Sequence, residues 1–172
     1  MTRPDLIASQ RHLFDIPADV AYLNCAYMAP NLKAVTAAGI AGVARKAEPW
    51  GVAARDFFSE AEETRGLFAR LVNATADDIA IVPSASYGLA TAAKNLPLAG
   101  GQTVVTLADQ FPSNVYIWRE AARAAGATVV TVAKSAEGWT APLLEAIGSK
   151  TAIVAIPHCH WTDGALVDLD AV

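Results

Sequence analysis

A serine-rich turn separates an apolar run from a helical pattern near the middle of the chain. Residues 84–88 read Ser-Ala-Ser-Tyr-Gly and follow the apolar residues 79–82. Backbone N–H groups at the start of a helix lack partners within the helix and lie at the positive end of its dipole, so such a turn binds phosphate well. The hydroxyls of Ser84 and Ser86 would add two donors. A serine that merely caps the helix produces the same pattern, and taken alone the motif favours the cap.

A second polar turn contains an aromatic side chain. Residues 109–114 read Asp-Gln-Phe-Pro-Ser-Asn and follow a strand predicted over 103–107. Phe111 at this place is suited to stack on a flat ligand. Alternatively, Phe111 belongs to the core and Pro112 simply begins the next helix. Taken alone, the turn leaves both interpretations open.

A third turn, residues 158–164, reads His-Cys-His-Trp-Thr-Asp-Gly and follows a strand predicted over 151–156. Its first three residues do not predict a metal site, because neighbouring positions on an extended chain point to opposite sides. His12 is the one histidine outside this turn, so no second pair of ligands completes a zinc site. Nothing in the sequence indicates an activated thiol at Cys159. The other polar groups of the turn are suited to hydrogen bonds with a ligand.

The elements between these turns predict an α/β fold. Short apolar strands alternate with helical patterns from residue 79 onward, which is typical of a mostly parallel sheet with helices on both faces. The carboxyl ends of parallel strands meet at one edge of the sheet, so the three turns are expected to line one ligand crevice. The predicted strands are 79–82, 103–107, 127–132 and 151–156, and the predicted helices are 32–43 (capped by Asn31), 57–72, 87–96, 113–125 (ended by Gly126) and 142–147.

Composition excludes several classes of protein. The 172 residues include 13 basic and 17 acidic side chains, and 53% of them are hydrophobic, which excludes a disordered chain. The slight acidity argues against nucleic acid as the main partner. No run approaches the roughly 18 apolar residues of a membrane span, so no membrane partner is expected. Two distant cysteines and a start without an apolar signal segment predict a cytoplasmic chain.

Taken together, the order and spacing of the turns resemble the pyridoxal-phosphate enzymes of the class V aminotransferase superfamily, which includes cysteine desulfurases, selenocysteine lyases and kynureninases. The segment Tyr-Leu-Asn-Cys-Ala at 22–26 is similar to the opening of such chains. The resemblance implies a large-domain fragment of the PLP-dependent transferase fold (fold type I), with a mostly parallel sheet. It divides the chain into an N-terminal arm, 1–30, and a partial PLP-binding large domain, 31–172, that is incomplete at its C-terminus.

The resemblance also implies a site for pyridoxal 5'-phosphate. In such enzymes the serine turn holds the cofactor phosphate, here through the backbones of Ala85 and Ser86 and the Ser86 hydroxyl. The segment 111–114, Phe-Pro-Ser-Asn, is similar to the kynureninase form of the loop whose aromatic stacks on the pyridine ring, which makes Phe111 the stacking residue. The implied cofactor-binding residues are Ala85, Ser86, Phe111, Pro112, Ser113, Asn114, Thr162 and Asp163.

The contact to the phenolic oxygen of the ring is left open by the resemblance. Family members make it just before a glycine that corresponds to Gly164, and desulfurases often use an asparagine where this chain has Trp161. That departure argues against a plain desulfurase. It leaves His160, Thr162 and Asp163 as alternatives for the contact.

Two essentials of these enzymes are expected beyond residue 172. One is the lysine that forms the internal Schiff base with the cofactor, and the other is the aspartate that pairs with the pyridine nitrogen. The chain alone is therefore expected to be inactive. The parent enzyme is expected to act on a small-molecule amino-acid substrate as a homodimer, by transaminase, desulfurase, lyase or epimerase chemistry. The alternatives are a complete, non-catalytic α/β module for a phosphate-bearing ligand, and a purely structural or interaction remnant.

Overall fold

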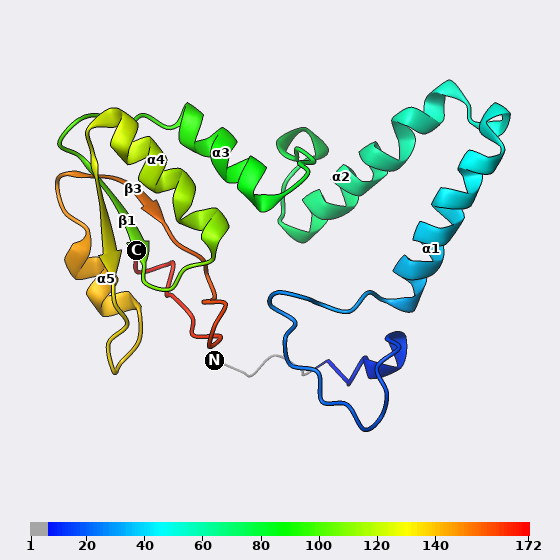
Figure 1. Cartoon of the computed structure of the whole chain (residues 1–172), viewed down its shortest axis with the longest axis horizontal. Helices are drawn as coiled ribbons and strands as arrows, with labels where there is room; N and C mark the ends of the chain where they lie inside the picture. The colour runs from blue at the N-terminus through cyan, green and yellow to red at the C-terminus, as the bar shows by residue number, and fades with distance from the viewer. Residues whose placement is uncertain (1–6) are drawn as a thin grey trace. The chain divides into compact units, whose positions relative to one another are not determined.

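The computed structural model describes residues 7–172 and divides the chain into two compact units, residues 1–81 and 82–172 (Figure 1). The first unit is helical and the second contains the sheet. Within the described residues, no helix is both long enough and apolar enough to cross a membrane.

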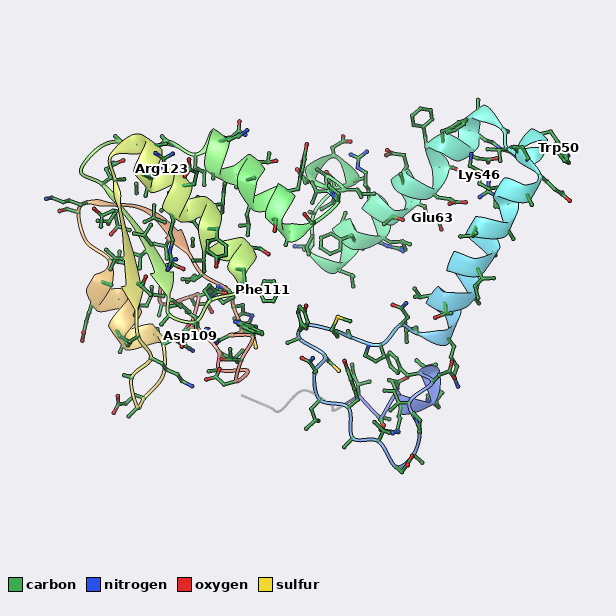
Figure 2. The ribbon with its side chains drawn as sticks, in the orientation of Figure 1. Lys46, Trp50, Glu63, Asp109, Phe111 and Arg123 are labelled. Atoms are coloured by element: carbon green, nitrogen blue, oxygen red, sulfur yellow. The ribbon has the colours of Figure 1, made fainter. Side chains whose placement is uncertain are left out.

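The first unit contains two helices, α1 (Lys33–Ala44) and α2 (Ser59–Leu71). Short 3₁₀ turns connect them, and one of these carries Trp50, which is 82% exposed (Figure 2). Both helices were predicted within two residues at each end. The predicted cap at Asn31 is wrong, because the residue before α1 is Leu32, and no side-chain hydrogen bond caps the helix.

The apolar run 79–82 was predicted to be a strand, and that prediction is wrong. A strand requires a neighbour for its backbone hydrogen bonds. The three strands assigned in residues 7–172 pair with one another and not with this run. Ile81 is accordingly 58% exposed. Apolar composition alone does not distinguish a buried strand from an unpaired extended segment.

The second unit is built on a parallel sheet with strand order β2-β1-β3. The central strand is therefore β1, and Val104 of β1 lies opposite Val129 of β2 and Ile153 of β3. The strands are β1 (Thr103–Leu107), β2 (Thr128–Val132) and β3 (Thr151–Ala155), and the helices are α3 (Ala85–Asn95), α4 (Tyr116–Ala125) and α5 (Thr140–Ala146).

Alternating residues of β1 build one core on each face of the sheet. Val105 and Leu107 are buried in the cluster that contains Leu143 of α5. Val104 is buried in the other cluster, with Trp118 of α4. In Figure 1, α4 and α5 accordingly lie on opposite faces of the strands. The period of two is the signature of a strand whose faces are both covered.

The sequence predicted these strands and helices within a few residues. Gly126 ends α4 in the left-handed conformation, with φ of 71°, as its place after the helical pattern predicted. The predicted helix 113–125 differs at its start, because the chain first makes a short 3₁₀ turn over Pro112–Asn114. Val115 then leaves helical geometry, with φ of −120°, before α4 begins at Tyr116.

Candidate functional site

The start of α3 presents backbone donors. Ser84 is the N-cap, and its Oγ accepts a hydrogen bond from the backbone N–H of Tyr87 at 3.1 Å. The capping interpretation of Ser84 is therefore confirmed. Capping leaves Ala85 and Ser86 as the first two helical residues, whose N–H groups precede the hydrogen-bond ladder of the helix. An anion placed before α3 would meet these two N–H groups and the positive end of the helix dipole.

The serine turn and the aromatic turn line common hollows. One hollow of about 420 Å³ is lined by Ser86 together with Pro112 and Ser113. A second, of about 600 Å³, is lined by Ala85 together with Asn114 and the chain that leaves β3. The structure thus brings the predicted phosphate-binding residues beside the turn that contains Phe111. They lie at the carboxyl ends of the strands, where parallel sheets bind ligands.

Phe111, which Figure 2 labels, packs against a residue of the third turn. Its ring meets the indole of Trp161 edge to face, with ring centroids 5.2 Å apart and planes at 86°. The indole N–H of Trp161 donates to the backbone carbonyl of Asp109 at 2.8 Å. Such aromatic pairs contribute about 0.5–1.5 kcal/mol beyond the area that they bury. Trp161 therefore fixes the turn that presents Phe111, and sequence reasoning had treated it only as a departure from a pattern.

Asn114 connects two elements of the fold. Its Nδ2 donates to the carbonyl of Ala155 at 3.1 Å, and its Oδ1 accepts from the indole N–H of Trp118 at 2.7 Å. Both ends of the amide are thus engaged with the protein. Asn114 attaches the start of α4 to the end of β3 and positions the turn before it.

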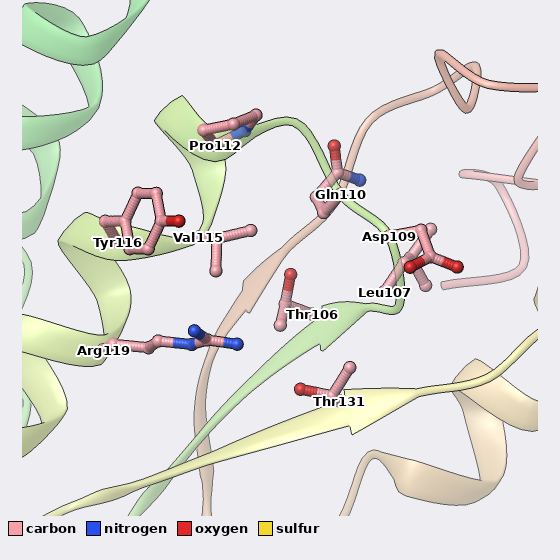
Figure 3. Close-up of a pocket in the computed structure, with 9 residues that line it drawn as sticks. All are labelled: Thr106, Leu107, Asp109, Gln110, Pro112, Val115, Tyr116, Arg119 and Thr131. Atoms are coloured by element: carbon pink, nitrogen blue, oxygen red, sulfur yellow. The ribbon is translucent and has the colours of Figure 1, made fainter.

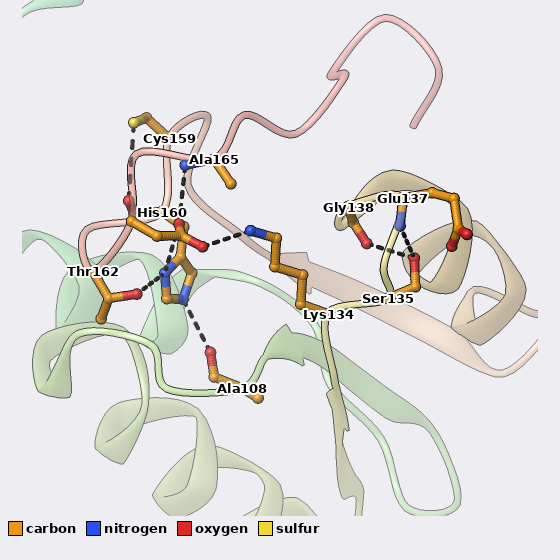
Figure 4. A network of polar contacts seen from close by, with 10 residues as sticks. Ala108, Lys134, Ser135, Glu137, Gly138, Cys159, His160, Thr162 and Ala165 are labelled. Carbon is orange, nitrogen blue, oxygen red and sulfur yellow. Dashed lines mark hydrogen bonds and ion pairs between the residues drawn. The ribbon is translucent and has the colours of Figure 1, made fainter.

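His160 faces inward at the end of the sheet. It is 1% exposed and stacks on Trp139 with ring centroids 4.6 Å apart. Its Nε2 lies 3.0 Å from the carbonyl of Ala108 and its Nδ1 2.9 Å from Oγ1 of Thr162 (Figure 4). A carbonyl only accepts, so Nε2 carries a hydrogen. Both ring nitrogens are occupied, which leaves His160 none for a ligand.

Asp163 forms an ion pair with Lys134, which follows β2. The carboxylate accepts from Nζ of Lys134 at 2.6 Å and from the backbone N–H of Ala165 at 2.9 Å. These bonds, chiefly that from Lys134, lower the pKa of Asp163 below its ordinary value, although desolvation acts in the opposite direction. The pair connects the third turn to the neighbouring strand connection. Gly164 completes the turn with φ of 70°, a conformation that favours glycine.

The three residues of the His-Cys-His segment do not share an environment. His158 and Cys159 are exposed, whereas His160 is buried. Among residues 7–172, no group of three or more histidine, cysteine or acidic side chains is placed to hold a metal ion.

A model of the Aminotransferase class-V family matches residues 41–172. The chain belongs to the class-V aminotransferases. This class-V chain is 31% identical over 121 residues to the uncharacterized aminotransferase YcbU of Bacillus subtilis. The match covers 69% of this chain and 31% of YcbU. It is 27% identical over 180 residues to the kynureninase of Deinococcus radiodurans, covering 98% of the chain and 42% of that enzyme.

Solved structures confirm the fold type I architecture. A variant of C-DES with glycine covalently linked to its PLP cofactor matches with a TM-score of 0.78 and 19% identity, covering 95% of this class-V chain and 44% of C-DES. The cysteine desulfurase CsdA of Escherichia coli matches with a TM-score of 0.70 and 20% identity, covering 94% of this chain and 43% of CsdA. The chain spans less than half the length of the relatives it matches. The predicted family and fold class are confirmed.

Proposed function

We propose that this chain supplies the phosphate-binding turn and the ring-stacking residue of a pyridoxal-phosphate-dependent enzyme that acts on an amino acid. The observation that carries the proposal is the shared hollow of Ser86, Pro112 and Ser113, next to Phe111. Membership of the class-V family supports the choice of cofactor.

The residues present fit the cofactor in two respects. The first N–H groups of α3 and the Ser86 hydroxyl suit a phosphate. Phe111 lies on the adjoining turn, with its ring held in place by Trp161. Pyridoxal phosphate, when bound, supplies a ring that withdraws electrons from an amino acid attached to it. The protein groups here orient that ring and hold its phosphate.

The third turn contributes mainly to position. His160 is buried and fully bonded, which removes it from the three alternatives for the phenolic oxygen. Thr162 is bonded to His160, and Asp163 is bonded to Lys134. We assign the contact to the exposed side of this turn, through Thr162 or Asp163. The choice of substrate and of reaction lies with residues outside this part of the molecule, and the homodimer and the cytoplasmic location are proposed with it.

The test is a visible absorption spectrum of the full-length protein that carries this chain. We expect a bound pyridoxal chromophore. Reduction with borohydride, followed by peptide mapping, then locates the lysine that holds it. The proposal expects that lysine outside residues 1–172. Attachment to one of the five lysines of this chain would overturn the part that places the lysine elsewhere, and a colourless protein that takes up no added cofactor would overturn the whole proposal. The lysines present are Lys33, Lys46, Lys94, Lys134 and Lys150.

A further inference from the structure

A further cavity lies on the β2 side of the central strand β1. Its volume is about 210 Å³, and it lies where β1 and β2 end beside the start of α4 (Figure 3). Thr106 and Thr131 come from the two neighbouring strands, and Arg119 comes from α4. Asp109 and Gln110 of the aromatic turn complete the polar lining. The proposed cofactor site lies toward α3 and β3 and shares Gln110, Pro112 and Tyr116 with this cavity, whereas Thr106, Thr131 and Arg119 line neither of the two hollows of that site.

Two residues that line this cavity carry buried donors without partners in residues 7–172, and one of them, Gln110, also lines the hollow of about 600 Å³. Thr106 is 2% exposed, and its Oγ1 has no hydrogen-bond partner among the described residues. The Oε1 of Gln110 accepts from the backbone N–H of Phe111 at 3.0 Å, which fixes the amide so that Nε2 is the free end. That Nε2 is also buried without a partner in residues 7–172. Leaving such groups unpaired is costly, so they indicate a bound polar species.

A cation adds charge to these donors. The guanidinium of Arg119 extends toward Thr106 and Thr131 in Figure 3. It lies 6.0 Å from the ring centroid of Tyr116, and no carboxylate of the described chain is within ion-pair distance of it. Guanidinium, amide and hydroxyl donors together suit the oxygens of an anion.

Asp109 does not restrict which anion fits. It lines the cavity but is exposed, and in Figure 3 its carboxylate points away from Thr106 and Arg119. We propose that the cavity binds a small oxyanion, with phosphate and sulfate as the simplest examples, through the hydroxyls of Thr106 and Thr131 and the guanidinium of Arg119. The inference does not depend on the proposed cofactor.

The test uses the full-length protein and follows its thermal midpoint while phosphate replaces sodium chloride at constant ionic strength. We expect a saturable rise of the midpoint with phosphate and with sulfate, since both present oxygens to these donors. Thr106→Val replaces the hydroxyl by a methyl group, and Arg119→Gln removes the guanidinium charge and shortens the side chain. Each should weaken apparent phosphate affinity about tenfold, because a hydrogen bond to a charged group is lost.

A matched variant makes the result specific. Arg123 lies one turn further along α4, pairs with Glu120 and does not line the cavity, so the phosphate response of Arg123→Gln should equal that of wild type. Thr106→Val should fold normally, because it removes a buried hydroxyl that has no partner.

The variant Ser86→Ala distinguishes phosphate bound in this cavity from phosphate bound at the start of α3. If only that variant loses the phosphate response, the phosphate binds in the serine turn and the present inference is wrong. An equal phosphate response in wild type and in Thr106→Val would also overturn it. If the cofactor proposal fails, the difference between wild type and Thr106→Val is still expected.

Discussion

The indole of Trp161 and the ring of Phe111 meet edge to face at 5.2 Å, although the two residues belong to turns that follow different strands. The same indole donates to the carbonyl of Asp109, two residues before Phe111. Trp161 therefore restrains both the backbone and the side chain of the aromatic turn.

Removal of this support should weaken cofactor binding without direct loss of a cofactor contact. We expect Trp161→Ala to reduce the affinity of the full-length protein for pyridoxal phosphate about three- to tenfold, because the aromatic pair and one hydrogen bond are lost. Trp161→Phe keeps a ring but loses the N–H, so its effect should be smaller. Absorbance titration measures both. Trp50→Ala, at an exposed site in the first unit, is the control, and an effect of Trp161→Ala no larger than this control would contradict the assignment.

Stability should depend on His160 and not on its neighbour His158. His160→Ala leaves the carbonyl of Ala108 without its partner and opens a space beside Trp139, so a loss of about 2–4 kcal/mol is expected. His158→Ala changes an exposed side chain and should stay within about 0.5 kcal/mol of wild type. Urea unfolding of the two variants checks the difference. Equal midpoints would show that the inward histidine is not part of the packed core.

Asp163 should make stability depend on pH in the acid range. Its pKa is lowered in the folded state, chiefly by the hydrogen bond from Lys134, so its contribution is present above the unfolded value of about 4. The contribution is lost as the pH falls through the lower folded value. Wild type should therefore exceed Asp163→Asn in stability at neutral pH, and the two should converge at the acid end.

The ion pair can be isolated with a second variant. In a Lys134→Met background, Asp163→Asn should have a smaller effect at neutral pH, because the larger cause of the lowered pKa is already absent. Asp19→Asn, at an exposed carboxylate, serves as the control. Urea midpoints measured across the acid range provide the comparison. A difference between wild type and Asp163→Asn that stays constant with pH would argue against the pair.

Local pattern predicted most of the second unit. Strand β1 was predicted at its observed limits, 103–107, because a run of apolar and β-branched residues spans these positions and small or polar residues flank it. The run 79–82 has a similar composition but no pairing partner, and pairing is a tertiary property that composition does not carry. The cap at Asn31 failed for a related reason, since a capping side chain must also reach the helix backbone.

The site was predicted in outline and not in its contacts. Parallel topology was enough to place the three turns at one edge of the sheet. The bond from Trp161 to Asp109 joins residues 52 positions apart, and that from Lys134 to Asp163 joins residues 29 positions apart. Such contacts depend on strand register and turn geometry. The orientation of the Gln110 amide is also not predictable from local sequence, because it is set by the hydrogen bond that its Oε1 accepts from the backbone N–H of Phe111.

The most direct test of the central claim is the affinity of the full-length protein for pyridoxal phosphate in matched pairs of variants. Ser86→Ala and Phe111→Ala remove the proposed phosphate hydroxyl and the proposed stacking ring. Ser59→Ala and Phe58→Ala make the same chemical changes at exposed positions of the first unit. We predict that each site variant binds the cofactor about tenfold more weakly than its control. Equal affinity within both pairs would contradict the account.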